Sequence, residues 1–191
     1  PSNLGTGMRA SIMVFIPALE ISGRIDELIA QARKFGLTFR GVYGEGSEGM
    51  GFLYQISNQG LLWLSEEEII DRVNDFFYNI YEEEMSLRAS LFEQNHDKLC
   101  DQILRAYGTI LNAYLLEEKE MFALLGWIRF GHELGLLSIS DTDMFMKLYY
   151  HAGSASMKEI RGFSQKEEEN HIRAEYIAKR VKNLVKKGGD R

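Results

Sequence analysis

The sequence is poor in cysteine and proline, and it lacks long apolar runs. Its 191 residues include one cysteine, Cys100, and two prolines. A single cysteine cannot form an internal disulfide, which is typical of proteins in a reducing cytosol. No apolar segment approaches the ~20 residues of a membrane span, and no signal-peptide pattern is present. These absences argue against a secreted disulfide-rich domain and a membrane protein, and we expect a cytoplasmic protein.

Positive charge is also scarce. The net charge is −6, and residues 65–191 hold 17 Lys/Arg against 23 Asp/Glu, whereas residues 1–64 hold five of each. An acidic chain is a poor candidate for nucleic-acid binding, so no such partner is expected. Residues 179–191 reverse the sign; this basic tail either docks on an acidic partner or is a solvated helix end.

Metal-ligand patterns are missing too. The chain has four histidines, which are scattered and form no zinc spacing: His96, His132, His151 and His171. Structural roles are therefore predicted for them, and no metal ligand is assigned. Cys100 falls in an apolar helical pattern, which favours packing over nucleophilic chemistry.

Glycine is abundant and gathers in two loops. The run from Arg40 to Gly51 reads Arg-Gly-Val-Tyr-Gly-Glu-Gly-Ser-Glu-Gly-Met-Gly, and Asn3-Leu-Gly-Thr-Gly-Met-Arg9 precedes an apolar segment. Neither is a Walker-type phosphate loop or a dinucleotide fingerprint. Arginine nevertheless suits phosphate oxygens, because its planar fork makes two charge-assisted hydrogen bonds. We predict that Arg9 and Arg40 bind nucleotide phosphates; the alternative is two surface arginines near turns.

The carboxylates of the second loop are candidates for substrate binding. Glu45 lies five residues beyond Arg40, between glycines, and could grip a cationic substrate as the loop closes. The glycines permit such motion and are also ordinary turn formers, and the two interpretations do not exclude each other.

The first part of the chain is predicted to be α+β. Branched and aromatic residues indicate strands over 9–16, 38–43 and 52–57, linked through loops that favour antiparallel pairing. Ser22 is expected to cap a helix over 23–35, and Ser65 with Glu68 forms a capping box for a long helix. On that helix, Glu82, Glu83 and Glu84 are assigned to the solvated face.

After residue 88 the pattern becomes helical throughout. Apolar periodicity predicts helices at 97–114, 117–134, 141–151 and 164–186, with Ser140 and a Ser164/Glu167 box as caps and Gly135 as a stop. The predicted architecture is a part of an antiparallel sheet with flanking helices over 1–88, followed by an all-α domain over 89–191.

Three motifs together resemble the guanidino kinases, the family of creatine and arginine kinases. They are Asn3-Leu-Gly-Thr-Gly-Met-Arg9-Ala, Arg40-Gly-Val-Tyr-Gly-Glu45-Gly-Ser-Glu and Gln55-Ile-Ser-Asn58, in this order. The motif Tyr-Gly-Glu-Gly-Ser-Glu and the helical extension resemble those of the bacterial protein-arginine kinases of the McsB type.

The resemblance implies a role for individual residues. Arg9 would hold ATP phosphates, and the nucleotide-binding strand would continue through Ala10, Ser11, Ile12 and Met13. Arg40 would grip the transferring phosphoryl group, while the backbone passes close to the nucleotide at Gly41, Val42, Tyr43 and Gly44. Glu45 would hold the acceptor guanidinium, and Ser2 falls beside the family's reactive cysteine. The implied cofactors are ATP and Mg²⁺.

Departures from the family pattern are also informative. The family's reactive cysteine would stand immediately before Pro1, and its general base further upstream, so we expect the chain to be an inactive piece of a longer protein. McsB-type proteins also carry an Arg-Asp-x-x-Arg-Ala phosphoarginine motif. The remnant here keeps only its last two residues: Glu169, Asn170, Arg173 and Ala174. Glu169 would repel an anionic phosphoarginine.

The expected parent protein phosphorylates arginines in proteins, in the stress response. By resemblance, its partners are protein substrates with exposed arginines, an activator protein and a Clp-type protease, and it forms a homodimer. Two alternatives stay open at this point. One is a phosphagen kinase acting on free arginine or a related guanidino compound, and the other is a catalytically silent interaction module.

Overall fold

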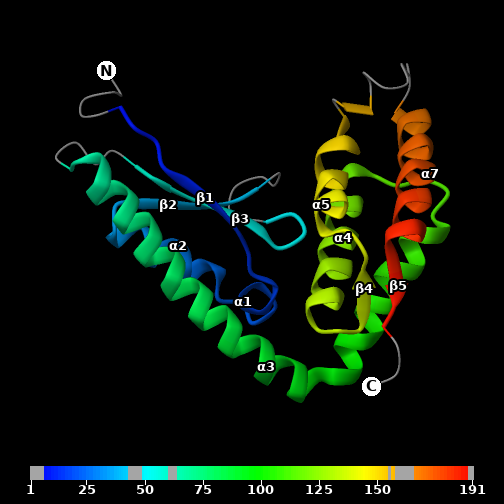
Figure 1. Cartoon of the computed structure of the whole chain (residues 1–191), viewed down its shortest axis with the longest axis horizontal. Coiled ribbons are helices and arrows are strands. Elements are labelled where there is room, and N and C mark those ends of the chain that lie inside the picture. The colour runs from blue at the N-terminus through cyan, green and yellow to red at the C-terminus, as the bar shows by residue number, and fades with distance from the viewer. Residues whose placement is uncertain (1–6, 43–48, 60–63, 155, 158–165, 189–191) are drawn as a thin grey trace. The chain divides into compact units, whose positions relative to one another are not determined.

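The computed structural model describes residues 7–42, 49–59, 64–154, 156–157 and 166–188 (Figure 1). The chain divides into two compact units, Pro1–Gln94 and Asn95–Arg191. None of the helices in the described ranges is long and apolar enough to cross a membrane.

The described part of the first unit is built on a three-stranded antiparallel sheet. Its strands are β1 (Ser11–Phe15), β2 (Leu37–Gly41) and β3 (Leu53–Asn58), in the order β1-β3-β2. This confirms the predicted α+β class and antiparallel pairing. β1 begins later than predicted, at Ser11, because the backbone N–H of Ala10 donates to the side chain of Asn58 instead of to a ladder carbonyl.

Two short helices connect β1 to β2. α1 (Pro17–Ile21) opens with proline at its first position, where the missing N–H has no intrahelical partner to lose. α2 (Ile25–Lys34) follows. The predicted cap at Ser22 is wrong: Ser22 ends α1, Gly23 turns the chain at φ +71°, and α2 starts after Arg24 without a side-chain cap. A positive φ favours glycine, so the break falls there.

The long helix α3 (Glu66–Asn112) packs with α2 on one side of the sheet (Figure 1). The predicted capping box is present, since Ser65 N donates to Glu68 Oε2 at 2.7 Å and Glu68 N donates to Ser65 Oγ at 3.2 Å. The backbone of Asn95 is not helical (φ −128°, ψ 26°) and divides α3 into two helical segments, in agreement with the separate helix predicted from residue 97.

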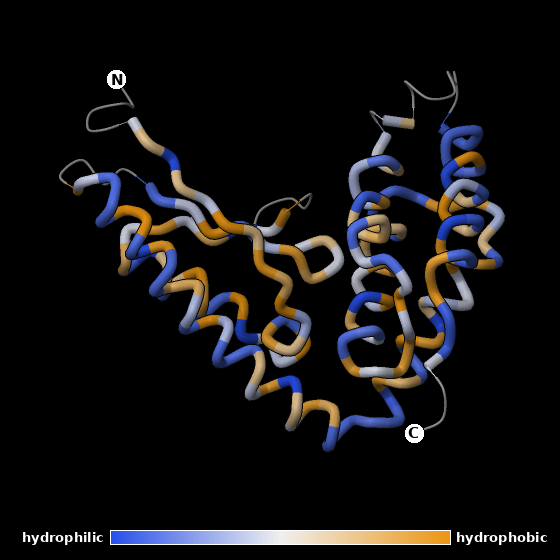
Figure 2. Tube along the Cα trace, viewed as in Figure 1, coloured by the Kyte–Doolittle hydropathy of each residue, from blue (hydrophilic) through white to orange (hydrophobic). Residues whose placement is uncertain are grey.

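Side-chain alternation along the strands separates two faces of the sheet. One face packs against α2 and α3 to form the core of the first unit, which includes Val14, Leu28, Ala32, Phe39, Tyr54, Ile56, Val73, Phe76 and Ile80. Figure 2 shows the apolar colouring of these strands and helices. The residues of the other face include Met13, Gln55 and Arg40, which are direct register partners across the three strands. This second face therefore carries the candidate phosphate ligand Arg40 together with Gln55.

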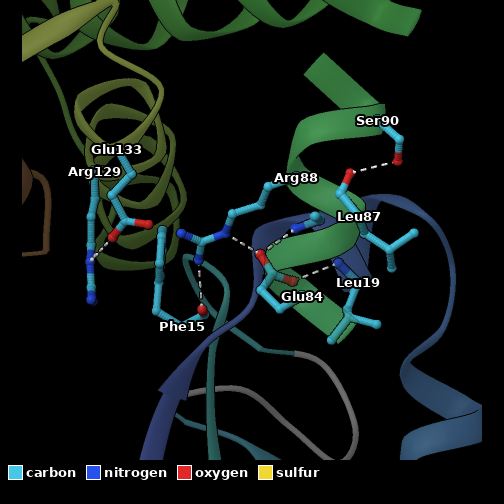
Figure 3. A network of polar contacts seen from close by, with 9 residues as sticks. Phe15, Leu19, Glu84, Leu87, Arg88, Ser90, Arg129 and Glu133 are labelled. Atoms are coloured by element: carbon cyan, nitrogen blue, oxygen red, sulfur yellow. Dashed lines mark hydrogen bonds and ion pairs between the residues drawn. The ribbon is translucent and has the colours of Figure 1, made fainter. Parts of the chain in front are cut away.

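Glu84 on α3 is buried, not solvated as predicted, with 2% of its surface exposed. Its carboxylate accepts hydrogen bonds from the backbone N–H groups of Ala18 (3.0 Å) and Leu19 (2.9 Å), near the start of α1. Arg88 donates to the same carboxylate at 2.6 Å and to the carbonyl of Phe15 at 3.1 Å (Figure 3). Because first-turn N–H groups lack intrahelical partners, Glu84 caps α1 from a distant helix.

Replacing Glu84 by alanine is expected to destabilise the protein by about 2–3 kcal/mol, because two buried N–H groups lose their acceptor and Arg88 loses its carboxylate. Chemical denaturation measures the effect, and hydrogen exchange locates it in residues 16–22. Glu82→Ala, on an exposed position of the same helix, is the matched control. Equal stability of the two variants would contradict the capping role.

The second unit contains a small sheet, so the all-α prediction for 89–191 is wrong. Its elements beyond α3 are α4 (Glu118–Glu133), β4 (Leu137–Ile139), α5 (Thr142–His151), α7 (Lys166–Leu184) and β5 (Val185–Lys187). β4 pairs with β5 in antiparallel register, Ser138 opposite Lys186. Each strand is three residues long, too short for a periodic signal in the sequence.

The ends of these helices follow local chemistry. Gly135 ends α4 at φ +77°, as predicted, because glycine adopts this conformation without steric cost. The cap of α5 is Asp141 rather than Ser140: its carboxylate accepts from Met144 N at 2.9 Å. The predicted Ser164/Glu167 box lies partly outside the described residues.

Candidate functional site

Arg40 lies on β2, one residue before the strand ends, and its side chain is exposed. Directly opposite in register, Gln55 of β3 accepts two hydrogen bonds through Oε1, from Nε at 3.3 Å and from Nη2 at 2.9 Å. These donors form one lateral edge of the guanidinium. Within the described residues the terminal edge, between Nη1 and Nη2, has no partner, so Arg40 can offer two parallel N–H groups to an oxyanion.

Arg9 lies two residues before β1, and its side chain is exposed. The carboxamide of Asn58 holds the backbone on both sides of it. Oδ1 accepts from Ala10 N at 2.9 Å, and Nδ2 donates to the carbonyl of Met8 at 3.0 Å. The backbone position of Arg9 is therefore fixed by β3 although the residue itself is outside the strand.

The other predicted nucleotide-binding residues divide between the two faces. Ser11 and Met13 share the face of Arg40, and Met13 is 46% exposed. Ala10 and Ile12 pack against the core cluster, so their side chains point away from that face. β2 ends at Gly41, and Val42 is the last described residue before the loop. The other predicted residues lie outside the described ranges: Ser2, Tyr43, Gly44 and Glu45.

The far end of the glycine-rich loop returns through a tight hairpin turn. Met50 and Leu53 form an antiparallel bridge around Gly51 (φ 63°) and Phe52 (φ 64°). Two consecutive positive φ angles define a two-residue turn of the type that suits hairpins, and glycine meets this requirement easily. Phe52 meets it at a cost, offset by burial and an edge contact with Phe15.

Gly49 is required for a different reason. A Cβ on this residue would lie 2.6 Å from the buried ring of Tyr54. Gly49 and Gly51 are thus explained by packing and backbone geometry, while Gly44 and Gly46 lie outside the described residues.

Arg173, the arginine that remains in the predicted phosphoarginine motif, is buried, with 1% of its surface exposed. Nε donates to the carbonyl of Ala152, and Nη1 donates to the carbonyl of Leu116 and to Asn170 Oδ1. Nη2 donates to Ser154 Oγ and to Glu169 Oε1. All five N–H groups are engaged.

Glu169 and Asn170 thus serve as internal partners of Arg173, and Ala174 is buried beside them. In this arrangement no N–H of Arg173 is left for a ligand. The cluster instead joins the loop before α4, the end of α5 and the first turns of α7.

Other titratable groups show no comparable site. Cys100 Sγ lies 3.6 Å from His96 Nε2, but burial, and secondarily the charge of Asp97, raises the pKa of the thiol. This disfavours the thiolate, in agreement with the packing role predicted for it. No group of three or more His, Cys, Asp or Glu side chains in the described ranges is placed to hold a metal ion.

Comparison with known proteins identifies the family. Residues 1–87 match the family described as ATP:guanido phosphotransferase, C-terminal catalytic domain. This match confirms the resemblance of the first part of the chain to the ATP:guanido phosphotransferases. Residues 96–190 match the protein-arginine kinase McsB C-terminal domain, which confirms the resemblance to the McsB type.

Individual relatives agree with this placement. The protein-arginine kinase of Caldanaerobacter subterraneus subsp. tengcongensis is 37% identical over 179 residues, covering 93% of this chain and 53% of the relative. The protein-arginine kinase of Clostridium botulinum is 38% identical over 177 residues, covering 93% of this chain and 52% of the relative. That of Bacillus subtilis is 34% identical over 173 residues, covering 91% of this chain and 48% of the relative. The chain spans about half the length of the curated relatives it matches.

Proposed function

We propose that the chain is the C-terminal portion of an ATP-dependent protein-arginine kinase, and that the parent protein transfers the γ-phosphoryl group of MgATP to arginine side chains in proteins. The observation that carries this proposal is Arg40, whose guanidinium is fixed along one edge by Gln55 and has no partner along the other among the described residues. It lies on a segment that matches the guanido phosphotransferase catalytic domain. The McsB C-terminal domain match favours arginine in proteins as the acceptor.

The proposed site assigns separate roles to its residues. Arg40 grips the transferring phosphoryl group and Arg9 holds the other ATP phosphates, because charge spread over phosphoryl oxygens is stabilised by fixed cations. Ser11 and Met13 line the same face, and the backbone at Gly41 and Val42 borders it. Glu45 orients the acceptor guanidinium, which must lose a proton before it can attack. Mg²⁺ arrives with the ATP phosphates.

The remaining assignments rest on resemblance. We place the catalytic function in residues 1–88, and dimerisation or substrate docking in residues 89–191. The proposed setting is the cytoplasm under stress, with an activator protein that regulates the kinase and a Clp-type protease that receives its products. Sedimentation of the purified full-length protein tests the homodimer directly.

A competition assay with two phosphoryl acceptors tests the proposed activity. The full-length protein is given MgATP together with a folded basic protein and free arginine at equal concentrations of guanidino groups, and phosphoarginine is measured in each. We expect phosphorylation of the protein acceptor to dominate. Preference for free arginine would instead assign the chain to the phosphagen kinases.

Calorimetric titration of the same protein with MgATP tests the remaining alternative. Heat of binding together with turnover is the expected result. An absence of both would identify a catalytically silent interaction module, in which the loops no longer bind nucleotide.

A further inference from the structure

We propose that Gln55 and Asn58 are positioning residues, which use two neutral carboxamides of one strand to place the two arginines of the phosphate site. The proposal rests on the proposed function, because it assumes that Arg40 and Arg9 act on phosphates. Both residues lie on β3, the central strand of the sheet, three positions apart. β3 thereby connects the two candidate phosphate ligands, which come from separate glycine-rich segments.

Gln55 controls the rotation of the Arg40 guanidinium. Its Oε1 accepts from Nε and Nη2 together, which fixes the plane of the guanidinium and occupies its lateral edge. An exposed arginine otherwise samples many rotamers, whose loss on binding would weaken the contact. With the lateral edge held, the terminal edge stays directed away from Gln55 and is free to meet two phosphate oxygens.

The neutrality of the amide is as important as its geometry. A carboxylate at position 55 could accept the same two hydrogen bonds, but it would neutralise the charge that Arg40 must offer to a phosphoryl group. The row containing Gln55 holds Met13 on one side and Arg40 on the other, so no carboxylate of this row faces the guanidinium. Gln55 orients Arg40 without reducing its positive charge.

Asn58 acts on Arg9 through the backbone. It accepts from Ala10 N and donates to the carbonyl of Met8, so one side chain closes a bridge around the residue. Residues 7–10, immediately before β1, lie outside regular structure, where backbone freedom is greatest. This bridge restricts that freedom while leaving the side chain of Arg9 exposed.

Steady-state kinetics of the full-length protein tests both assignments. We expect Gln55→Ala to lower kcat by about 10- to 100-fold, the range for losing a hydrogen bond to a charged group. Gln55→Glu restores both hydrogen bonds, yet should stay at least as slow because it cancels the charge. Asn58→Asp accepts from Ala10 N but cannot donate to Met8, and should mainly raise KM for ATP. Gln59→Ala, which removes the acceptor of a hydrogen bond from Thr38 next to β3, is the control, and its kcat and KM should equal those of the parent.

A double variant separates this proposal from the proposed function. In an Arg40→Ala background, Gln55→Ala should add no further loss, because its effect passes through Arg40. If Arg40→Ala is inactive while Gln55→Ala and Gln55→Glu match the parent, the positioning role fails and the proposed function stands. If Arg40→Ala itself keeps full turnover, the proposed phosphate site fails. Rescue of kcat by Gln55→Glu would show that the two hydrogen bonds suffice, and would overturn the claim that the partner of Arg40 must be neutral.

Discussion

Arg40→Ala in the full-length protein is expected to reduce arginine phosphorylation by about 10³-fold or more, which is the effect of removing a cationic contact to a transferring phosphoryl group. The loss should appear in kcat, because Arg40 would stabilise the charge that is spread over the phosphoryl oxygens in the transition state. Thermal unfolding should be nearly unchanged, since the Arg40 side chain is exposed and its only partner in the described residues is Gln55.

Two further variants sharpen this result. Arg40→Lys keeps the positive charge but loses the planar fork, so it should recover only part of the rate. Arg33→Ala removes an exposed arginine from α2 and serves as the matched control, with activity expected to equal that of the parent. An Arg40→Ala protein that retained most of its turnover would disprove the assignment of Arg40.

Arg173→Ala is expected to destabilise the protein by about 3–5 kcal/mol, the cost of breaking a buried ion pair by removing one partner. Glu169 is left as a buried carboxylate without its cation, and two backbone carbonyls, of Leu116 and Ala152, lose their donor. Denaturant unfolding of the chain measures the total. Hydrogen exchange should show the loss of protection in α5 and α7.

Exposed ion pairs provide the comparison. Arg105→Ala breaks a pair with Asp101 in which the two side chains are 73% and 61% exposed, and should destabilise the protein far less than Arg173→Ala, because solvent screens exposed pairs. A double variant, Arg173→Met with Glu169→Leu, removes both buried charges and should recover part of the loss. If Arg173→Ala were no more destabilising than Arg105→Ala, the cluster would not hold α7 in place.

The sequence predicts best where the signal is local. The Ser65/Glu68 capping box, the glycine stop at Gly135 and the strands of the first unit depend on neighbouring residues, and the structure contains each of them. The motifs around Arg9 and Arg40 also suffice to indicate the family. Helix and strand ends shift by a few residues, because competing caps such as Asp141 and Ser140 lie side by side.

What the sequence does not reveal depends on partners far along the chain. The sequence pattern places Glu84 on an acidic surface, yet its two backbone donors, the N–H groups of Ala18 and Leu19, lie more than sixty positions away. The pairing of β4 with β5 joins segments separated by the whole of α5 and α7. Gln55 was part of the family motif, but its contact with Arg40 requires the register of β2 against β3. Such contacts follow only from the three-dimensional fold.

The saturation of Arg173 has a consequence for self-modification. A kinase that phosphorylates arginine side chains carries arginines of its own, and each exposed one, such as Arg33 or Arg105, is a possible acceptor in a neighbouring molecule. A guanidinium can attack only if one of its nitrogens is accessible and can lose a proton. Every N–H of Arg173 is held and its side chain is 1% exposed. Under the proposed function, the fold thus keeps the kinase from phosphorylating an arginine of its own whose loss would disrupt the packing of the second unit.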